Sequence, residues 1–107
     1  MRAWQTFVDA GIAVINDMDE RRTTREDSIV FPNGWVGSIV PDRSGEGWSV
    51  AMCDWNGYFD WDALKPYGRE NGTIYCATEE DVCEALTIIQ GIKNNNYFEP
   101  LEHYFTV

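Results

Sequence analysis

Three aspartates lie close together in the stretch "MCDWNGYFDWDAL", residues 52–64, among two tryptophans, a tyrosine and a phenylalanine. Paired carboxylates beside aromatic rings are typical of glycoside hydrolases, in which two acids stand about 5–5.5 Å apart for retention and further apart for inversion. On an extended strand, Asp60 and Asp62 share one face with their Cα atoms roughly 7 Å apart. No second acidic motif converges on them, and a chain of 107 residues leaves little room for a deep sugar cleft. We therefore expect no enzyme and assign no catalytic residue.

Nucleophilic and metal chemistry have no better support in the sequence. The cysteines Cys53, Cys76 and Cys83 include no C-x-x-C spacing, and the single histidine, His103, lies far down the chain. Zinc sites need clusters of cysteine and histidine, and the three aspartates lack the loop spacing of an EF-hand. We expect no metal and no cofactor, and we interpret the cysteines as reduced, small hydrophobic residues of the interior.

The charge balance disfavours two classes of partner. Eighteen acidic residues against eight basic ones give a formal net charge of −10. Such a surface repels nucleic-acid phosphates and anionic membranes, and it attracts basic proteins at long range. Solubility alone also explains an excess of acid, so the charge leaves open whether a basic partner exists. Direct contact with nucleic acid or membrane is not expected.

The start of the chain, "MRAWQTFVDAGIAVINDM", contains an arginine and several apolar residues, as a signal peptide does. Asp9 interrupts the apolar run, however, and no convincing small-residue cleavage site follows. No apolar stretch approaches the roughly 20 residues of a membrane span. The sequence predicts a cytoplasmic protein, present as a monomer or a weak homodimer.

Hydrophobic periodicity predicts a single α+β domain over residues 1–107. An amphipathic helix is expected over residues 3 to about 20, and a second helix begins at Thr78, which forms a capping-box pattern with Asp81. Between them, extended runs separated by turn residues predict an antiparallel sheet of about five strands, with both helices packed on one face. The five runs are "SIVF", "WVGSIV", "WSVAMCDW", "YFDW" and "TIYCA".

Asn56-Gly57 is the strongest hairpin signal in the chain, and a two-residue loop there fixes the register of the flanking strands. Trp55 then faces Tyr58, and Cys53 faces Asp60. Because side chains alternate along a strand, one face is expected to belong to the core and the other to be half exposed. The core face carries Val50, Met52, Phe59 and Trp61, with Asp54 near the turn; the other carries Ala51, Cys53, Trp55, Tyr58, Asp60 and Asp62.

The half-exposed face is the candidate docking surface. Trp55 and Tyr58 are large, rigid and partly polar, as residues at the centre of an interface often are. Acidic residues in or next to the strands would steer a basic partner by long-range attraction. For Trp55 and Tyr58 alone, a cross-strand pair that stabilises the hairpin by ~0.2–1 kcal/mol is an equally good interpretation. The acidic members of this surface are Asp42, Glu46, Asp54, Asp60 and Asp62.

Three stretches, "FPNGWVGSIV", "WSVAMCDWNGYFDW" and "ATEEDVCEALTIIQGI", cover 40 of the 107 residues, more than a third of the chain. A small, acidic, aromatic-rich α+β domain with such stretches resembles the immunity proteins of bacterial polymorphic toxin and contact-dependent growth-inhibition systems. This is a resemblance of class, since these proteins share no residue motif. It implies an antitoxin that binds one cognate toxin domain, often a basic nuclease, and covers its active site or substrate groove. The alternative is a small acidic regulatory or adaptor module, phage-derived and mimicking nucleic-acid charge, that binds a basic host protein.

Overall fold

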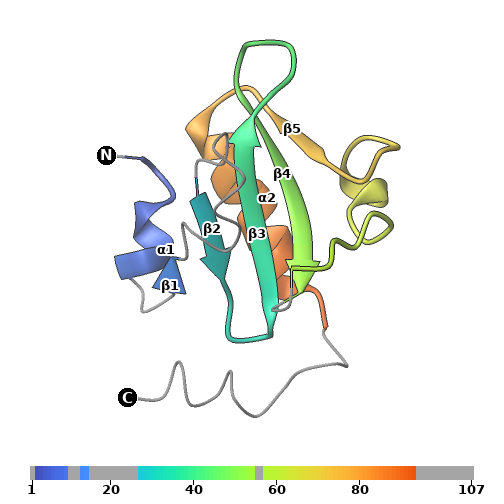
Figure 1. Cartoon of the computed structure of the whole chain (residues 1–107). Coiled ribbons are helices and arrows are strands. Elements are labelled where there is room, and N and C mark those ends of the chain that lie inside the picture. The colour runs from blue at the N-terminus through green and yellow to red at the C-terminus, as the bar shows by residue number, and fades with distance from the viewer. Residues whose placement is uncertain (1, 10–12, 15–26, 55–56, 94–107) are drawn as a thin grey trace.

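The computed structural model describes residues 2–9, 13–14, 27–54 and 57–93. They form an α+β fold in which the helix α2 (Glu79–Gly91) lies across one face of an antiparallel sheet (Figure 1). Four strands follow one another in chain order across the sheet, and the two-residue strand β1 (Ala13–Val14) pairs with the first of them at the edge. The four are β2 (Asp27–Val30), β3 (Trp35–Pro41), β4 (Trp48–Asp54) and β5 (Ile74–Cys76).

The longest ladder of the sheet joins β3 to β4, from the pair Trp35–Asp54 to the pair Pro41–Trp48. Residues that face α2 alternate with residues that face away, as the pleat requires. Ile39, Val50 and Met52 face the helix and are fully buried. These positions confirm the strands expected from "WVGSIV" and "WSVAMCDW".

Helix α2 confirms its expected start and its apolar stripe. The Thr78 N–H donates to the Asp81 carboxylate (3.2 Å), and the Asp81 N–H donates to the Thr78 hydroxyl (3.2 Å), which completes the capping box. One side of the helix is buried in the core against the sheet. The buried residues of this stripe are Val82, Ala85, Leu86 and Ile89.

Asn33 joins the β2–β3 turn to the far end of α2. Its side-chain amide nitrogen lies 3.0–3.1 Å from the backbone carbonyl oxygens of Ile89, Gln90 and Ile92. Its side-chain oxygen accepts a hydrogen bond from the Trp35 N–H (3.0 Å). The last carbonyls of a helix have no partner within the helix. One side chain therefore both shapes the turn and caps the helix.

Gly37 allows α2 to approach β3 closely. A Cβ atom at this position would lie 2.5 Å from Leu86 Cδ2 and 3.5 Å from Ile89 Cδ1. Real Cβ atoms do not tolerate the first of these distances, so any larger residue must displace Leu86. The strand residue is small because the helix side chain occupies its space.

The helix expected over residues 3 to about 20 is not confirmed. The helix α1 covers only Gln5–Asp9, and Ala13–Val14 pair with β2 as the strand β1. Trp4 is buried in the core beneath α2, where its ring meets that of Trp48 edge-on with centroids 5.6 Å apart. The apolar residues of this stretch have a helical spacing, but pairing with β2 overrides the local preference at residues 13–14. Residues 10–12 and 15–26 lie outside the described residues.

The hairpin register predicted from Asn56-Gly57 is wrong by one residue. Cys53 pairs with Phe59, not with Asp60, and the Asp54 N–H donates to the Tyr58 carbonyl (3.0 Å). The Gly57 N–H donates to the Asp54 carbonyl, and Gly57 has a φ of 88°. Such bonds close a three-residue loop with a glycine in the left-handed region, the next commonest hairpin after the two-residue one.

The added loop residue moves the return segment to the other face of the sheet, as a slip of one residue must. Phe59 packs against Val30, Val36 and Cys53 on the face away from α2. It therefore does not share the core face of Met52, contrary to the prediction. The run "YFDW" also forms no strand, because only Phe59 makes a bridge and a turn begins at Trp61.

Candidate functional site

Residues 57–73 lead from β4 to β5, and we call this segment the 57–73 connection. Leu64 is fully buried in the main core and anchors its middle. A short 3-10 helix, η1 (Lys65–Tyr67), follows, and the Arg69 N–H donates to the Thr73 carbonyl (2.8 Å) where the chain turns into β5. The connection is thus fixed at its centre and at its exit.

Asp60 and Asp62 stabilise the local backbone of this connection. One carboxylate oxygen of Asp60 accepts hydrogen bonds from the Asp62 and Ala63 N–H groups, both at 3.1 Å. Asp62 forms an exposed ion pair with Lys65 (2.8 Å), and this partner lowers the pKa of the Asp62 carboxyl. The two carboxylates are therefore engaged in separate local contacts.

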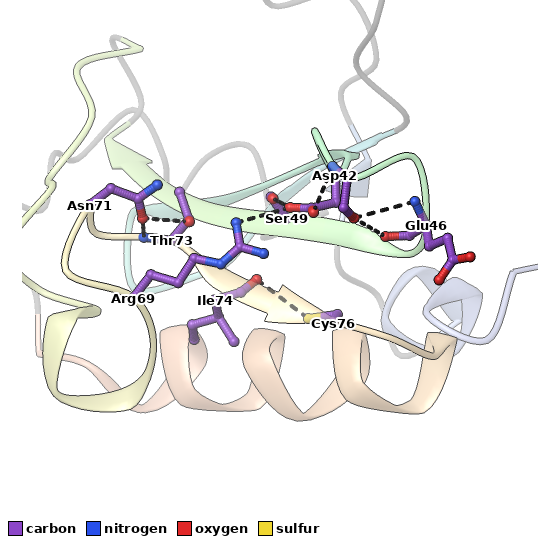
Figure 2. Close-up of polar contacts among 9 residues, drawn as sticks. Asp42, Glu46, Ser49, Arg69, Asn71, Thr73, Ile74 and Cys76 are labelled. Carbon is purple, nitrogen blue, oxygen red and sulfur yellow. Dashed lines mark hydrogen bonds and ion pairs between the residues drawn. The ribbon is translucent and has the colours of Figure 1, made fainter.

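Asp42 begins the turn between β3 and β4, and its side chain is almost completely buried. It accepts hydrogen bonds from the Ser44 N–H (3.1 Å) and the Ser49 hydroxyl (2.5 Å), and it pairs with the Arg69 guanidinium (3.0 Å). Hydrogen bonds from Ser44, Ser49 and Arg69 hold the pKa of the Asp42 carboxyl well below its usual range. Figure 2 shows Arg69 reaching from the 57–73 connection to Asp42 and Ser49, with Asn71 and Thr73 beside it.

The Arg69 guanidinium has a second contact that fixes its position. It lies over the ring of Tyr75 in β5, 4.9 Å from the ring centroid. A cation above an aromatic face is attracted by the ring quadrupole. Arg69 thus connects the β3–β4 turn, the 57–73 connection and β5 into one unit.

Large hydrophobic side chains are exposed in one part of the described chain. The four such side chains all come from residues 58–75, that is, from the 57–73 connection and the adjoining β5. Exposed large apolar side chains that gather in one patch mark binding surfaces; here Tyr58 lies beside the end of β4, and Tyr75 pairs with Ser49 near its start. The exposed fractions are 75% for Tyr58, 49% for Trp61, 55% for Tyr67 and 39% for Tyr75.

The acidic residues predicted to form one docking surface lie at two ends of a strand. Asp42 and Glu46 belong to the turn before β4, whereas Asp54 ends β4. The seven residues of β4 span ~20 Å at the usual rise of a strand. Glu46 is exposed, and Asp54 accepts a hydrogen bond from the Tyr58 N–H (3.0 Å). Trp55 lies outside the described residues.

Several exposed residues of this region were not among the predicted candidates. Trp61 was assigned to the core because of the wrong hairpin register. Tyr67 follows Pro66 in a stretch expected to be a loop, and an aromatic residue in a loop is the signal that would have singled it out. The contact between Arg69 and Asp42 joins segments 27 positions apart, and nothing in the sequence links them.

A shallow pocket of about 400 Å³ opens beside the Asp42–Arg69 ion pair. The end of β3 forms one wall through Val40 and Pro41, and Trp61 of the 57–73 connection contributes an aromatic ring. Two guanidinium groups, from Arg43 and Arg69, also line it, together with Asn71 and Thr73. Arg69 is neutralised by Asp42, so Arg43 brings the one uncompensated positive charge among these lining residues, in a chain with a net charge of −10.

The remaining expectations concern metals, thiols and membranes. No three metal-ligating side chains cluster within the described part of the chain.

Cys53, Cys76 and Cys83 are free thiols, the first two buried and the third half-buried. Burial, together with the nearby Asp81 and Glu84 carboxylates, raises the pKa of the Cys76 thiol to about 12. None of the helices seen in residues 2–9 and 57–93 has the length and apolar character needed to cross a bilayer. His103 lies beyond the described residues.

Comparison with known proteins gives this chain no relative: no protein-family model, no curated protein and no solved structure matches it.

Proposed function

We propose that this protein is an immunity protein that binds a cognate, basic toxin domain, of the nuclease type, and covers its active site or substrate groove. The observation that carries the proposal is the set of exposed aromatic side chains between Tyr58 and Tyr75 in a strongly acidic chain. Tyrosine and tryptophan are the residues most enriched among those that dominate binding energy. A negative surface raises the rate of encounter with a cationic protein.

The anchoring of the 57–73 connection supports the same proposal. Leu64 in the core, the Asp60 hydrogen bonds and the Arg69 contacts hold the connection in place before any partner arrives. A surface that is ordered in advance loses less conformational entropy on binding. Tyr58 and Tyr67 can then enter an interface at low cost, because each has only two side-chain torsions.

The structure changes which acidic residues are best tested. Reversing Asp60 or Asp62 would also break the local contacts described above, so a loss of binding would have two explanations. Glu70 is exposed, lies within the 57–73 connection and has no hydrogen bond or ion pair with a described residue. Glu84 is an exposed acid on α2 and serves as its control.

The proposal expects a toxin gene directly upstream of the gene for this chain, and the test follows binding of the toxin domain encoded there by surface plasmon resonance. The double variant Tyr58→Ser/Tyr67→Ser should dissociate on the order of tenfold faster or more, because both anchors are lost. Glu70→Lys should slow association, and Glu84→Lys should slow it less. Unchanged rates in the first two variants would contradict the proposal, and so would the absence of any binding to that toxin domain.

A further inference from the structure

The volume and the arginine side chains of the pocket beside Asp42 and Arg69 are not explained by docking to a basic protein. Its volume of about 400 Å³ falls within the roughly 300–1,000 Å³ of small-molecule sites. Arg43 and Arg69 both line it, and a basic partner would avoid two guanidinium groups. The pocket is therefore better matched to an anionic ligand.

The hydrogen bonds that the pocket-lining residues already make show which of their donors remain available to an anionic ligand. The Ser49 hydroxyl donates to Asp42, and the Thr73 hydroxyl donates to the Asn71 side-chain oxygen (2.7 Å), so these groups are already paired. Three groups keep donors to offer: the Asn71 amide NH₂, the Arg43 guanidinium and the part of Arg69 that is not bound to Asp42. Arginine and amide donors together recognise the oxygen atoms of a carboxylate or a phosphate.

Arg69 is held in place before a ligand binds. Asp42 and the Tyr75 ring fix its guanidinium, while its side chain remains 39% exposed. Arg43 is exposed and has no hydrogen bond or ion pair with a described residue. The Arg69 guanidinium is therefore fixed, whereas the Arg43 side chain can move toward a bound anion. A donor that is fixed beforehand loses little conformational entropy when the ligand binds.

Trp61 supplies a flat surface next to these donors. One face of its indole stacks on Phe59, with ring centroids 4.8 Å apart and an interplanar angle of 8°. No other described ring contacts Trp61, and about half of the residue is exposed. The stacked pair holds the indole still, and the exposed part of Trp61 is available to a planar group.

The net negative charge of the whole chain limits how many negative charges a ligand of this pocket can carry. A net charge of −10 works against a polyanion, whose many phosphates meet long-range repulsion. A single anionic group bound close to two guanidinium groups avoids most of this repulsion, because separated charges are screened at physiological salt.

We propose that this pocket binds a small molecule that carries one anionic group, phosphate or carboxylate, on a planar aromatic ring system. The anion lies between Arg43, Arg69 and Asn71, and the ring stacks on the open face of Trp61. The site does not depend on the toxin-binding function proposed above.

The test is a titration of the ¹⁵N-labelled full chain, followed by its backbone and indole N–H signals in two-dimensional NMR spectra. Adenosine 5′-monophosphate and 2-naphthoate combine a ring with a phosphate or a carboxylate, whereas adenosine and inorganic phosphate each supply one half. We expect saturable shifts of the Trp61 indole and of residues 69–73 with at least one combined ligand. Which of the two binds more tightly identifies the preferred anion.

Two variants of pocket residues and one control variant outside the pocket test whether the ligand binds at this site. Arg43→Gln should weaken it roughly tenfold or more, as expected for a charge-assisted hydrogen bond. Trp61→Leu should weaken it roughly tenfold through lost stacking. Lys93→Gln makes the same change of charge at the end of α2, outside the pocket, and should leave the affinity within about twofold because its charge is exposed and screened.

The outcomes are separable. Saturable binding lost in Arg43→Gln and kept in Lys93→Gln supports the site. Equal weakening in both of these variants, inorganic phosphate as tight as the combined ligands, or no saturable shift at all would overturn it. Arg43 makes no hydrogen bond or ion pair with a described residue, so Arg43→Gln should fold, and the result stands even if Trp61→Leu does not.

Discussion

The sheet face beneath α2 and the 57–73 connection are held together by different interactions. Beneath α2, fully buried aliphatic side chains such as Ile39, Met52 and Leu86 fill the space between helix and sheet. In the connection, Leu64 is buried and Phe59 packs on a smaller cluster, and carboxylate hydrogen bonds and ion pairs near the surface add to its order. Apolar burial is strong and undirected, whereas each polar contact is weak and depends on its geometry.

This difference separates stability from binding. Changes beneath α2 should alter the free energy of unfolding, while changes of exposed residues in the connection should alter affinity. Natural proteins commonly place binding residues on loops held by a rigid scaffold. The predictions below test how sharply this division holds here.

The largest effect is expected where α2 approaches β3. Leu86→Ala should lower the free energy of unfolding by ~3 kcal/mol, because it leaves a cavity in the core. Gly37→Ala should cost ~1–3 kcal/mol by overpacking against Leu86. In the double variant, the new methyl group enters the space vacated by Leu86, so the cost should be less than the sum. Urea denaturation of the four proteins measures the coupling, and strict additivity would show that the two residues do not compete for space.

The next effect concerns the side chain that caps α2. Asn33→Asp should lower the free energy of unfolding by ~2 kcal/mol. The substitution replaces a donor with a carboxylate that faces three carbonyls at the negative end of the helix dipole. Thermal unfolding measures the cost at pH 7. Because Asn33→Asp keeps the acceptor of the Trp35 N–H, its cost should shrink as the carboxyl is protonated at low pH, and a cost that stays the same from pH 7 to about pH 3 would contradict the electrostatic explanation.

A smaller effect with a distinct pH dependence is expected for Arg69→Gln. The folded-state pKa of Asp42 lies below its unfolded value of about 3.9, so its contribution to stability is present above that pH and is lost as the pH falls. The stability difference between wild type and variant should therefore exist at pH 7 and narrow only below the Asp42 pKa of the variant, which the Ser44 and Ser49 hydrogen bonds still lower. Lys65→Gln removes an exposed ion pair and should change stability less at both pH values. A difference for Arg69→Gln at pH 7 no larger than that for Lys65→Gln would rule out a stabilising role of the Asp42–Arg69 ion pair.

The smallest effect is expected for the exposed aromatic rings. Tyr58→Ser and Tyr67→Ser should each change the free energy of unfolding by no more than ~0.5 kcal/mol, because neither side chain is buried. Denaturation curves measured with the binding experiment above check this. A loss of stability above ~1 kcal/mol would mean that these rings support the fold and that the two regions are not separable.

The sequence specified well the parts of the fold whose signal is periodic or local. The apolar stripe of α2 and the Thr78–Asp81 capping box follow from residues three and four positions apart. The strands of the β3–β4 ladder are long apolar runs between turn residues, and such runs are readily recognised. Local spacing was sufficient in each of these cases.

Features that depend on contacts across the fold were not predicted. The helical spacing of residues 3–20 carries no information about the pairing of residues 13–14 with β2. The hairpin register depended on whether the loop had two residues or three, and bonds made by Asp54 decide this. That error moved Trp61 into the expected core, and it concealed the pocket that Trp61 shares with Arg43 and Arg69.

The placement of Asn33 has a consequence for the ageing of the protein. Asn33 precedes Gly34, and an asparagine before glycine is prone to deamidate when the glycine nitrogen attacks the side-chain amide. In the folded chain the Gly34 N–H is bonded to the Phe31 carbonyl, and the Asn33 amide is occupied at the helix end, so the two reacting groups are held by other partners. Deamidation of Asn33 would therefore require transient opening of the C-terminal end of α2. The carboxylate that it produces would cap this end less well than the amide does.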